Sequence, residues 1–272
     1  MEKLDKLRRL QLAELEILDE FIRICGAHGL RYYLTGGSLL GALRHGGFIP
    51  WDDDIDVAMP REDYDRFAAL CGRELDGRLF YQSPETDPGY FLSYAKLRMN
   101  GTEIYEPRFR DSRFHKGIYI DLFPLDFCPQ PGLWSHFLFN TLAVMNYRGQ
   151  VDSGEAYVPY RELSGKLGYG ALSVFSAKAL PGVRKRVLTV ASRGGDVYLA
   201  SFSGAYGYHK EVFPAEWYGE AQSRVFEDRV CCIPAAPEKI LAQLYGEDYM
   251  TVPQAETQNI HVEVDKIRFD TQ

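Results

Sequence analysis

Closely spaced aspartates are the residues of this sequence best suited to chemistry. They fall in the run WDDDIDV, at Asp52, Asp53, Asp54 and Asp56. Because side chains alternate along a strand, Asp54 and Asp56 would share one face about 6.6 Å apart, while Ile55 faces a core. Two neighbouring carboxylates repel each other unless a cation lies between them. Hard oxygen ligands favour Mg²⁺ or Mn²⁺, so we expect Asp54 and Asp56 to be metal ligands rather than part of a solvated acidic loop.

The roles of Asp52 and Asp53 stay open from the sequence. Asp52 could cap a helix or form a salt bridge with Arg44. Asp53 would point away from the face of the other two aspartates if the strand has already begun there. We therefore expect Asp52 and Asp53 to support the site rather than to bind the metal. The late histidines His209 and His261 have no ligand-like spacing, and their roles are open as well.

A third carboxylate is expected at Asp121, in the centre of the apolar strand GIYIDLF at 117–123. An aspartate among Ile and Leu either pairs with a cation or serves a site. Phosphoryl transfer with metal ions needs a carboxylate from a neighbouring strand, which binds metal and accepts the proton of the attacking hydroxyl group. We predict that Asp121 is this residue, whereas Asp126 is expected in a turn.

A glycine-rich turn upstream of the aspartates is suited to phosphate. A short strand at 31–34 leads into Gly36-Gly37-Ser38, and a helix is expected at 39–45. The N-terminus of a helix presents free N–H groups and the positive end of its dipole to an anion. Gly37 would let the backbone approach a phosphate group, and the hydroxyl group of Ser38 would add a donor.

Basic residues supply the remaining candidate ligands for phosphate. Arg44 can bind a phosphate group through two parallel hydrogen bonds, and His45 can donate to phosphate or to a nucleotide base. The alternative for both is a scaffolding contact with the aspartates. Lys96 and Arg98 share one face of a strand and would form a basic wall, in which Lys96 is the predicted phosphate ligand.

The rest of the sequence predicts the elements that hold these residues. Apolar residues at helical spacing predict an amphipathic helix at 3–26, which Gly29 ends in a left-handed conformation. Strands are expected at 51–59, 79–82, 91–98, 117–123 and 197–202, with a hairpin at 223–233. Further helices are expected at 61–75, 133–145, within 160–192 and at 237–245. The Asn100-Gly101 turn predicts antiparallel pairing of 93–99 with 102–105.

This order of elements favours one α+β domain over residues 1–272, with a helical insertion at about 130–195. Strands occur in both halves of the chain, which argues against two independent domains. The helix at 133–145 is apolar on most sides and is therefore expected to be buried. Residues from about 248 onward are polar and are expected to lie over the surface.

Composition limits the classes of partner. The chain has 272 residues and a formal net charge of −7, whereas a protein that binds a nucleic-acid backbone over a wide face usually carries excess Lys and Arg. No nucleic-acid partner is therefore expected, while a small phosphorylated ligand bound through a metal remains compatible. The five cysteines form no CxxC pair, which is typical of a reducing cytoplasm and argues against a zinc site.

Membrane segments are not expected. The N-terminal stretch mixes charge throughout and shows no signal-peptide core. No apolar run approaches the roughly 20 residues needed to span a bilayer, so we expect a soluble, cytoplasmic protein. A basic cluster at Lys178, Arg184, Lys185 and Arg186 indicates either a solvated helix face or a peripheral contact with an anionic acceptor or the inner face of a membrane.

The stretch GGSLLGALRHGGFIPWDDDIDV resembles the signature of the LicD family, which includes bacterial phosphocholine transferases and fukutin-type ribitol-phosphate transferases. Gly37-Ser38 followed by Asp54-Ile55-Asp56 is similar, more loosely, to the nucleotidyltransferase (polymerase beta-like) superfamily. The likeness is dense from 34 to 67 and continues in KLRMNGT, YIDLFPLD and FEDRVCCIP…LYGEDYM. It implies a nucleotidyltransferase-like mixed sheet flanked by helices.

The resemblance also implies a function. Relatives of this kind transfer a phosphorylated alcohol, such as phosphocholine or a polyol phosphate, from a CDP-linked donor to a hydroxyl group of a glycan or lipid-linked glycan, and CMP leaves. Carried over by position, Asp54, Asp56 and Asp121 would bind Mg²⁺ (or Mn²⁺), and Gly37 and Ser38 would meet the diphosphate.

Two alternatives to this function stay open. The first is a nucleotidyltransferase that uses an NTP and releases pyrophosphate. The second is an inactive family member that binds a glycan, which the presence of all three acids disfavours. Arg44 and His45 match the Arg-His pair of the family, without a settled role for either. Ser38 stands where many relatives have Thr, which leaves the chemistry unchanged.

Overall fold

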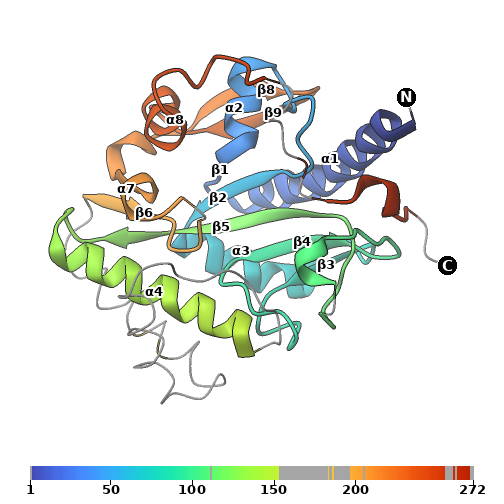
Figure 1. The fold of residues 1–272 in the computed structure, drawn as a ribbon, viewed down its shortest axis with the longest axis horizontal. Helices are drawn as coiled ribbons and strands as arrows, with labels where there is room; N and C mark the ends of the chain where they lie inside the picture. Colours follow the sequence, from blue (N-terminus) through green and yellow to red (C-terminus); the bar gives the residue numbers. More distant parts are fainter. Residues whose placement is uncertain are drawn as a thin grey trace.

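The computed structural model describes residues 2–110, 112–152, 183, 186, 197–204, 206–254, 260 and 262–269. Within these residues, a sheet forms the centre of the fold and helices pack around it (Figure 1). The predicted helices within 160–192, most of the predicted insertion at 130–195, and all of the basic cluster except Arg186 lie outside the described residues.

The strands are β1 (Tyr33–Leu34), β2 (Asp56–Pro60), β3 (Leu79–Gln82), β4 (Ala95–Met99), β5 (Tyr119–Cys128), β6 (Tyr198–Ala200), β7 (Val212–Pro214), β8 (Gln222–Phe226) and β9 (Arg229–Ile233). The α-helices are α1 (Glu2–His28), α2 (Gly36–Arg44), α3 (Arg61–Glu74), α4 (Leu133–Asp152), α7 (Tyr208–Glu211) and α8 (Pro237–Tyr245). Short 3₁₀ helices are η1 (Pro107–Phe109), η4 (Ala215–Trp217) and η6 (Val264–Lys266).

β5 is the central strand of the sheet, whose order is β1-β2-β5-β4-β3. β2 runs parallel to β5, and the other described strand pairs are antiparallel. β6 pairs with the last residues of β5, and β7 pairs with β6, so the sheet is extended at that end. A mixed sheet with helices confirms the predicted α+β class, while the nucleotidyltransferase-like topology stays a prediction.

The main core lies between the sheet and the helices α1 and α3. Phe21 of α1 and Phe67 of α3 are fully buried, and their ring centroids are 5.0 Å apart. Val57, Leu97 and Leu122 belong to the same core and alternate with polar residues of their strands. Because strand side chains alternate between two faces, the polar residues of these strands are left to the opposite face.

A second group of elements lies near β1. α2 contacts α8 and β8, and β1 contacts β9, and these elements lie together at the top of Figure 1. The rings of Phe48 and Phe226 pack edge to face, with centroids 5.1 Å apart. The predicted hairpin at 223–233 and the predicted helix at 237–245 are confirmed by β8–β9 and α8. The C-terminal third of the chain is thereby brought against the glycine-aspartate segment.

The element bounds near the aspartates differ from the prediction. α2 begins at Gly36 rather than after Ser38, so the expected Gly-Gly-Ser turn is the first turn of the helix. β2 begins at Asp56, which leaves the residues from Trp51 to Ile55 in an irregular segment. Three consecutive acids, Asp52, Asp53 and Asp54, lie in this irregular segment, and only Asp56 lies in the strand.

The predicted pairing of 93–99 with 102–105 is wrong. Gly101 does adopt the left-handed conformation of a turn, with φ +70°. β4 instead has β3 on one edge and β5 on the other. Because both edges of β4 are occupied, no edge is left for the residues after the turn, and Ile104 donates its N–H to the carbonyl of Lys116.

Two expectations about exposure are also corrected. The C-terminal residues Val262, Val264 and Ile267 are buried rather than spread over the surface, and η6 contacts α1. On α4, Leu138 and Leu142 are buried, whereas Leu133 is 92% exposed, so the helix buries one side and not most sides. Among the described residues, no helix combines the length and the apolarity needed to cross a membrane. The cytoplasmic location stays a prediction.

Candidate active site

The register of the sheet brings the predicted carboxylates together. Asp56 of β2 is the partner of Asp121 on the parallel strand β5, and Lys96 of β4 is the antiparallel partner of Asp121. Asp54 precedes β2. Each of Asp54, Asp56 and Asp121 offers a carboxylate oxygen within 4.8 Å of the others. We call these three residues the acidic cluster.

Burial and mutual repulsion make the acidic cluster unfavourable without a counter-charge. Burial raises the pKa of Asp56 well above its usual range, and the charges of Asp54 and Asp121 raise it further. Lys96 opposes this rise. A divalent cation would remove the repulsion, and a set of carboxylate oxygens is the donor set that Mg²⁺ and Mn²⁺ prefer. The residues present therefore fit the predicted metal.

Lys96 lies inside the sheet rather than on an open wall. Its side chain is fully buried, and its Nζ donates to Oδ1 of Asp121 at 2.5 Å. The same Nζ lies 3.3 Å from the ring centroid of Tyr119. Burial raises the pKa of Asp121, and Lys96 holds that rise down. Arg98 is buried too and donates to Gln82 and to the carbonyl of Gly117, so it braces the sheet.

The first turn of α2 packs directly on the aspartates. A Cβ atom at Gly36 would lie 2.7 Å from Oδ2 of Asp56, and one at Gly37 would lie 2.6 Å from Oδ2 of Asp52. Ser38 accepts the backbone N–H of Asp56 on its hydroxyl oxygen at 2.9 Å. Carboxylates at this end of a helix are favoured by its dipole. The glycines and Ser38 thus position the carboxylates, and their contact with a diphosphate stays a prediction.

Arg44 and His45 lie at the other end of α2. Arg44 donates from Nη1 to the carbonyls of Tyr249 at 2.9 Å and Thr251 at 3.4 Å. Arg44 also donates from Nε to Nε2 of His45 at 2.9 Å. Burial and the neighbouring Arg44 lower the pKa of His45. A neutral imidazole that accepts at Nε2 carries its proton on Nδ1, so His45 has an N–H to donate. The two residues remain candidates for phosphate.

The other acids of the neighbourhood have structural partners. Oδ2 of Asp53 accepts the N–H of Val262 at 2.7 Å, so this buried aspartate fastens the C-terminal segment. Asp126 was expected in a turn, but it lies buried in β5 and forms two hydrogen bonds with Arg61, at 2.7 and 2.8 Å. Asp52, Asp53 and Asp54 also offer three oxygens within 4.8 Å, although the contact with Val262 uses one oxygen of Asp53.

A polar stripe on α1 was missed in the sequence. Arg8, Gln11 and Glu14 are spaced by three residues, and Gln11 donates to the carbonyl of Asp52 at 3.0 Å. Glu14 is 1% exposed. Its burial raises its pKa well above the usual range, and the charges of Asp54 and Asp53 raise the pKa further. The available signal was two polar residues, at positions 11 and 14, inside an apolar helix face.

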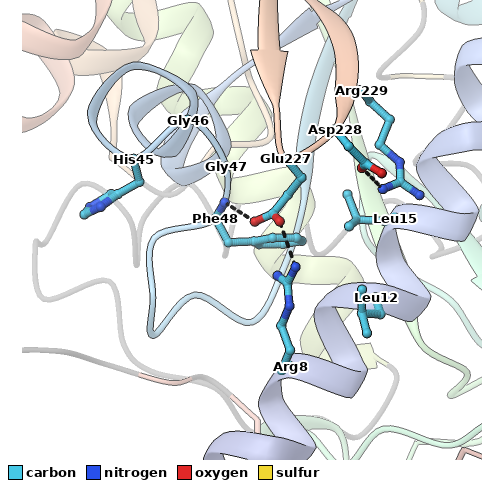
Figure 2. Close-up of a pocket in the computed structure, with 10 residues that line it drawn as sticks. All are labelled: Arg8, Leu12, Leu15, His45, Gly46, Gly47, Phe48, Glu227, Asp228 and Arg229. Carbon is cyan, nitrogen blue, oxygen red and sulfur yellow. Dashed lines mark hydrogen bonds and ion pairs between the residues drawn. The ribbon is translucent and has the colours of Figure 1, made fainter.

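Figure 2 shows how α1 reaches the loop between α2 and the aspartates. Arg8 pairs with Glu227 at 2.7 Å, and Glu227 accepts the N–H of Phe48 at 3.3 Å. The N–H of Glu227 in turn donates to the carbonyl of Gly46 at 2.8 Å. A cavity of about 440 Å³ lies beside these residues, with His45 on its wall. The β8–β9 turn and α1 therefore hold the loop that separates His45 from the aspartates.

Two tyrosines near the acidic cluster were missed as well. Tyr206 follows β6, and Tyr245 ends α8. Burial raises the pKa of each phenol, and the charge of Asp56 contributes to the rise in both. Of the two late histidines, His209 lies against His136 and Tyr208, and His261 lies outside the described residues. No pattern in the sequence links Tyr206 with Tyr245.

Comparison with known families gives a match that spans the acidic cluster. Residues 29–153 match the family described as LicD/FKTN/FKRP, nucleotidyltransferase domain. Residues 29–153 are therefore similar to a LicD family domain, and this stretch contains Asp54, Asp56 and Asp121.

Individual relatives extend this similarity. The chain is 29% identical to the lipopolysaccharide cholinephosphotransferase LicD of Haemophilus influenzae over 262 residues, which cover 94% of the chain and 95% of the relative. It is 49% identical to the ribitol 5-phosphate transferase FKRP of Homo sapiens over 105 residues, 37% of the chain and 21% of the relative. It is also 30% identical to mannosyltransferase regulator 4 of Saccharomyces cerevisiae over 108 residues, 38% of the chain and 9% of the relative.

Proposed function

We propose that the protein transfers a phosphorylated alcohol, either phosphocholine or a polyol phosphate, from a CDP-linked donor to a hydroxyl group of a glycan or lipid-linked glycan. CMP is the other product. The proposal rests on the approach of Asp54, Asp56 and Asp121, whose carboxylate oxygens lie within 4.8 Å of one another. The names of the relatives, a cholinephosphotransferase and a ribitol 5-phosphate transferase, support a phosphoryl-alcohol transferase.

Asp54, Asp56 and Asp121 would hold the Mg²⁺ or Mn²⁺ ion. When bound, the ion would neutralise negative charge on the donor diphosphate. Lys96 occupies Oδ1 of Asp121, which leaves the second oxygen of that carboxylate for the ion. The fixed ammonium group of Lys96 also adds a positive charge beside the place where the phosphate groups would lie.

The chain supplies the groups that the transfer needs. The acceptor oxygen bonds to the phosphorus that carries the alcohol, the bond from this phosphorus to the CMP oxygen breaks, and the hydroxyl proton moves to a carboxylate. Asp121 is the candidate base, because its carboxylate lies beside Asp56 on the neighbouring strand, where the acceptor hydroxyl group would approach the ion. Arg44, oriented by the carbonyl of Tyr249, is the candidate to bind the phosphate of departing CMP.

A CMP-release assay tests the proposal. The purified chain is incubated with Mg²⁺ and each of CDP-choline, CDP-ribitol and CDP-glycerol, with and without a glycan acceptor. We expect CMP from one of these donors, more of it with the acceptor, and none after EDTA is added. Release of pyrophosphate from CTP or ATP in place of CMP would establish the nucleotidyltransferase alternative. Neither product, together with no stabilisation by CDP and Mg²⁺, would indicate an inactive binding protein.

A further inference from the structure

Tyr245 belongs to the motif LYGEDYM, of which the chemistry described so far uses only the carbonyl of Tyr249. It is the last residue of α8, and its hydroxyl group accepts a hydrogen bond from the hydroxyl group of Tyr206 at 3.2 Å. The two rings pack edge to face, with centroids 5.6 Å apart and planes at 84°. The contact joins a helix end to a segment 39 residues earlier in the chain.

The Tyr206–Tyr245 pair lies beside the acidic cluster. The charge of Asp56 acts on both phenols, and that of Asp54 acts on Tyr206. Tyr245 also contributes to the electrostatic surroundings of Arg44. The pair is also near α2 in the fold, because α8 contacts α2 and Arg44 of α2 donates to the carbonyl of Tyr249, four residues after Tyr245.

The segment that carries Tyr206 is built around one buried acid. Oε1 of Glu211 accepts the N–H of Tyr206 at 3.0 Å, and Glu211 is 5% exposed. A side chain at Gly204 would overlap the carboxylate of Glu211. Lys210 then ties the segment to α8 by donating its Nζ to the carbonyl of Leu244 at 2.5 Å. These contacts hold the backbone of the segment in place, and the side chain of Tyr206 then reaches Tyr245.

The hydrogen bond between the two tyrosines leaves one proton for another partner. Each phenol carries one proton and can donate one hydrogen bond. Tyr206 donates to Tyr245, and among the described residues no acceptor is found for the proton of Tyr245. Because burial and nearby carboxylates keep both phenols protonated, Tyr245 presents a neutral O–H donor at the edge of the acidic cluster.

We infer that Tyr245 is a ligand-binding residue of this site and donates its hydroxyl hydrogen bond to a phosphoryl oxygen of a nucleoside diphosphate, with Tyr206 as its positioning residue. A neutral hydroxyl group can bind an oxyanion beside carboxylates without adding to their negative charge. A phosphoryl oxygen is also the acceptor that Arg44 would attract. This inference rests on the proposed function.

The test compares Tyr245→Phe, Tyr206→Phe and Tyr208→Phe. Tyr208 is the matched control, because its hydroxyl group is also hydrogen-bonded, at 2.6 Å to Ser135, but on the side of α4. The dissociation constant of CDP with Mg²⁺ is measured by calorimetry, and each ligand-free melting temperature is recorded. We expect Tyr245→Phe to weaken CDP binding roughly tenfold or more, Tyr206→Phe to weaken it less, and Tyr208→Phe to leave it unchanged.

A double variant separates positioning from general structural damage. If Tyr206 acts through Tyr245, Tyr206→Phe/Tyr245→Phe binds CDP no more weakly than Tyr245→Phe alone. Unchanged CDP binding in Tyr245→Phe would overturn the inference, and so would an effect confined to the KM of the glycan acceptor. In both cases the wild-type chain still binds CDP and the proposed function stands. A wild-type chain that binds no CDP would instead overturn both.

Discussion

Asp121 and Lys96 form an ion pair inside the candidate site. Their side chains are 7% and 0% exposed, and 2.5 Å separate Oδ1 from Nζ. Two charges at this depth are costly to remove from water, and loss of one leaves the other uncompensated. The pair therefore fixes the orientation of Asp121 and keeps a positive charge next to the carboxylates.

Lys96→Met is expected to lower the free energy of unfolding by about 3 kcal/mol, because it leaves a buried carboxylate without its partner. Lys96→Met/Asp121→Leu should recover part of that loss, since both charges are then gone. Urea unfolding of Lys96→Met, Asp121→Leu and the double variant measures the coupling free energy between the two residues. Strictly additive losses would contradict a direct interaction between the two residues.

Gly36 and Gly37, the first two residues of α2, lie so close to aspartate carboxylates that a side chain there would collide with them. Gly37→Ala should displace the carboxylate of Asp52, because its Cβ would lie 2.6 Å from Oδ2. Gly72→Ala in α3 is the matched control, since nothing lies within 4 Å of that position. We expect CMP release to fall roughly tenfold or more in Gly37→Ala and to stay unchanged in Gly72→Ala, which should gain about 1 kcal/mol of stability.

The proximity of Asp54, Asp56 and Asp121 could be expected from the sequence, whereas contacts between distant segments could not, and a metal-binding role for the three aspartates stays a prediction. The register of β2 and β5 pairs Asp56 with Asp121, and Asp54 reaches them from the irregular segment before β2 rather than from the predicted strand. Glu14 and Tyr245 were not found, because each reaches the cluster from a helix far away in the sequence. Burial that comes from tertiary packing left no local pattern around Tyr245, and for Glu14 it left only the polar residues at positions 11 and 14 of an apolar helix face.

At the scale of elements, the β8–β9 turn holds in place the loop that precedes the aspartates. Glu227 has φ +57°, and no other described residue except glycine has a positive φ. This conformation costs of order 1–3 kcal/mol. Its carboxylate meets Arg8 and the N–H of Phe48, as Figure 2 shows. The strain is therefore offset by contacts that hold the loop.

Glu227→Gly should free this loop from the β8–β9 turn without unfolding the protein. Glycine adopts a positive φ at no steric cost, which offsets the lost ion pair and keeps the melting temperature near that of the wild type. The amide of Phe48 should exchange with deuterium about tenfold faster, because its acceptor is gone. Hydrogen exchange read by mass spectrometry at 44–52 checks this. Unchanged exchange would show that Glu227 does not hold the loop.

Most elements could be predicted from the sequence, whereas their neighbours in the sheet could not. α1, α3, α8 and the β8–β9 hairpin follow from helical spacing, glycine stops and turn residues. The pairing around β4 was wrong, because a favourable Asn-Gly turn does not say which edge of a strand is already occupied. The long strand β5 joins β2, β4 and β6, and only the tertiary fold determines that order.

At the scale of the whole molecule, one buried acid links stability to pH near neutrality. Burial raises the pKa of Glu211 from 4.5 to about 7, and the hydrogen bond from Tyr206 opposes the rise. A raised pKa means that the folded chain binds the proton more tightly than the unfolded chain. The stabilisation is therefore complete below pH 4.5 and is lost as the pH rises through about 7.

Glu211→Gln should remove this pH dependence, because the amide stays neutral. The difference in unfolding free energy between wild type and variant should change by on the order of 3 kcal/mol between pH 4.5 and pH 8, and the wild type should be the one that weakens. Denaturant unfolding at several pH values measures it, and the comparison cancels other titrating groups. Parallel profiles of the two proteins would contradict a titration at Glu211.

The central claim is that the acidic cluster carries out Mg²⁺-dependent phosphoalcohol transfer, and Asp56→Asn tests it most directly. Because burial and like charges raise the pKa of Asp56, replacing its carboxyl group by an amide relieves repulsion and should leave the melting temperature equal or higher. CMP release from CDP-choline, CDP-ribitol and CDP-glycerol is measured for both proteins with Mg²⁺. The account predicts release by the wild type and none by the folded variant. Full CMP release by Asp56→Asn would contradict it.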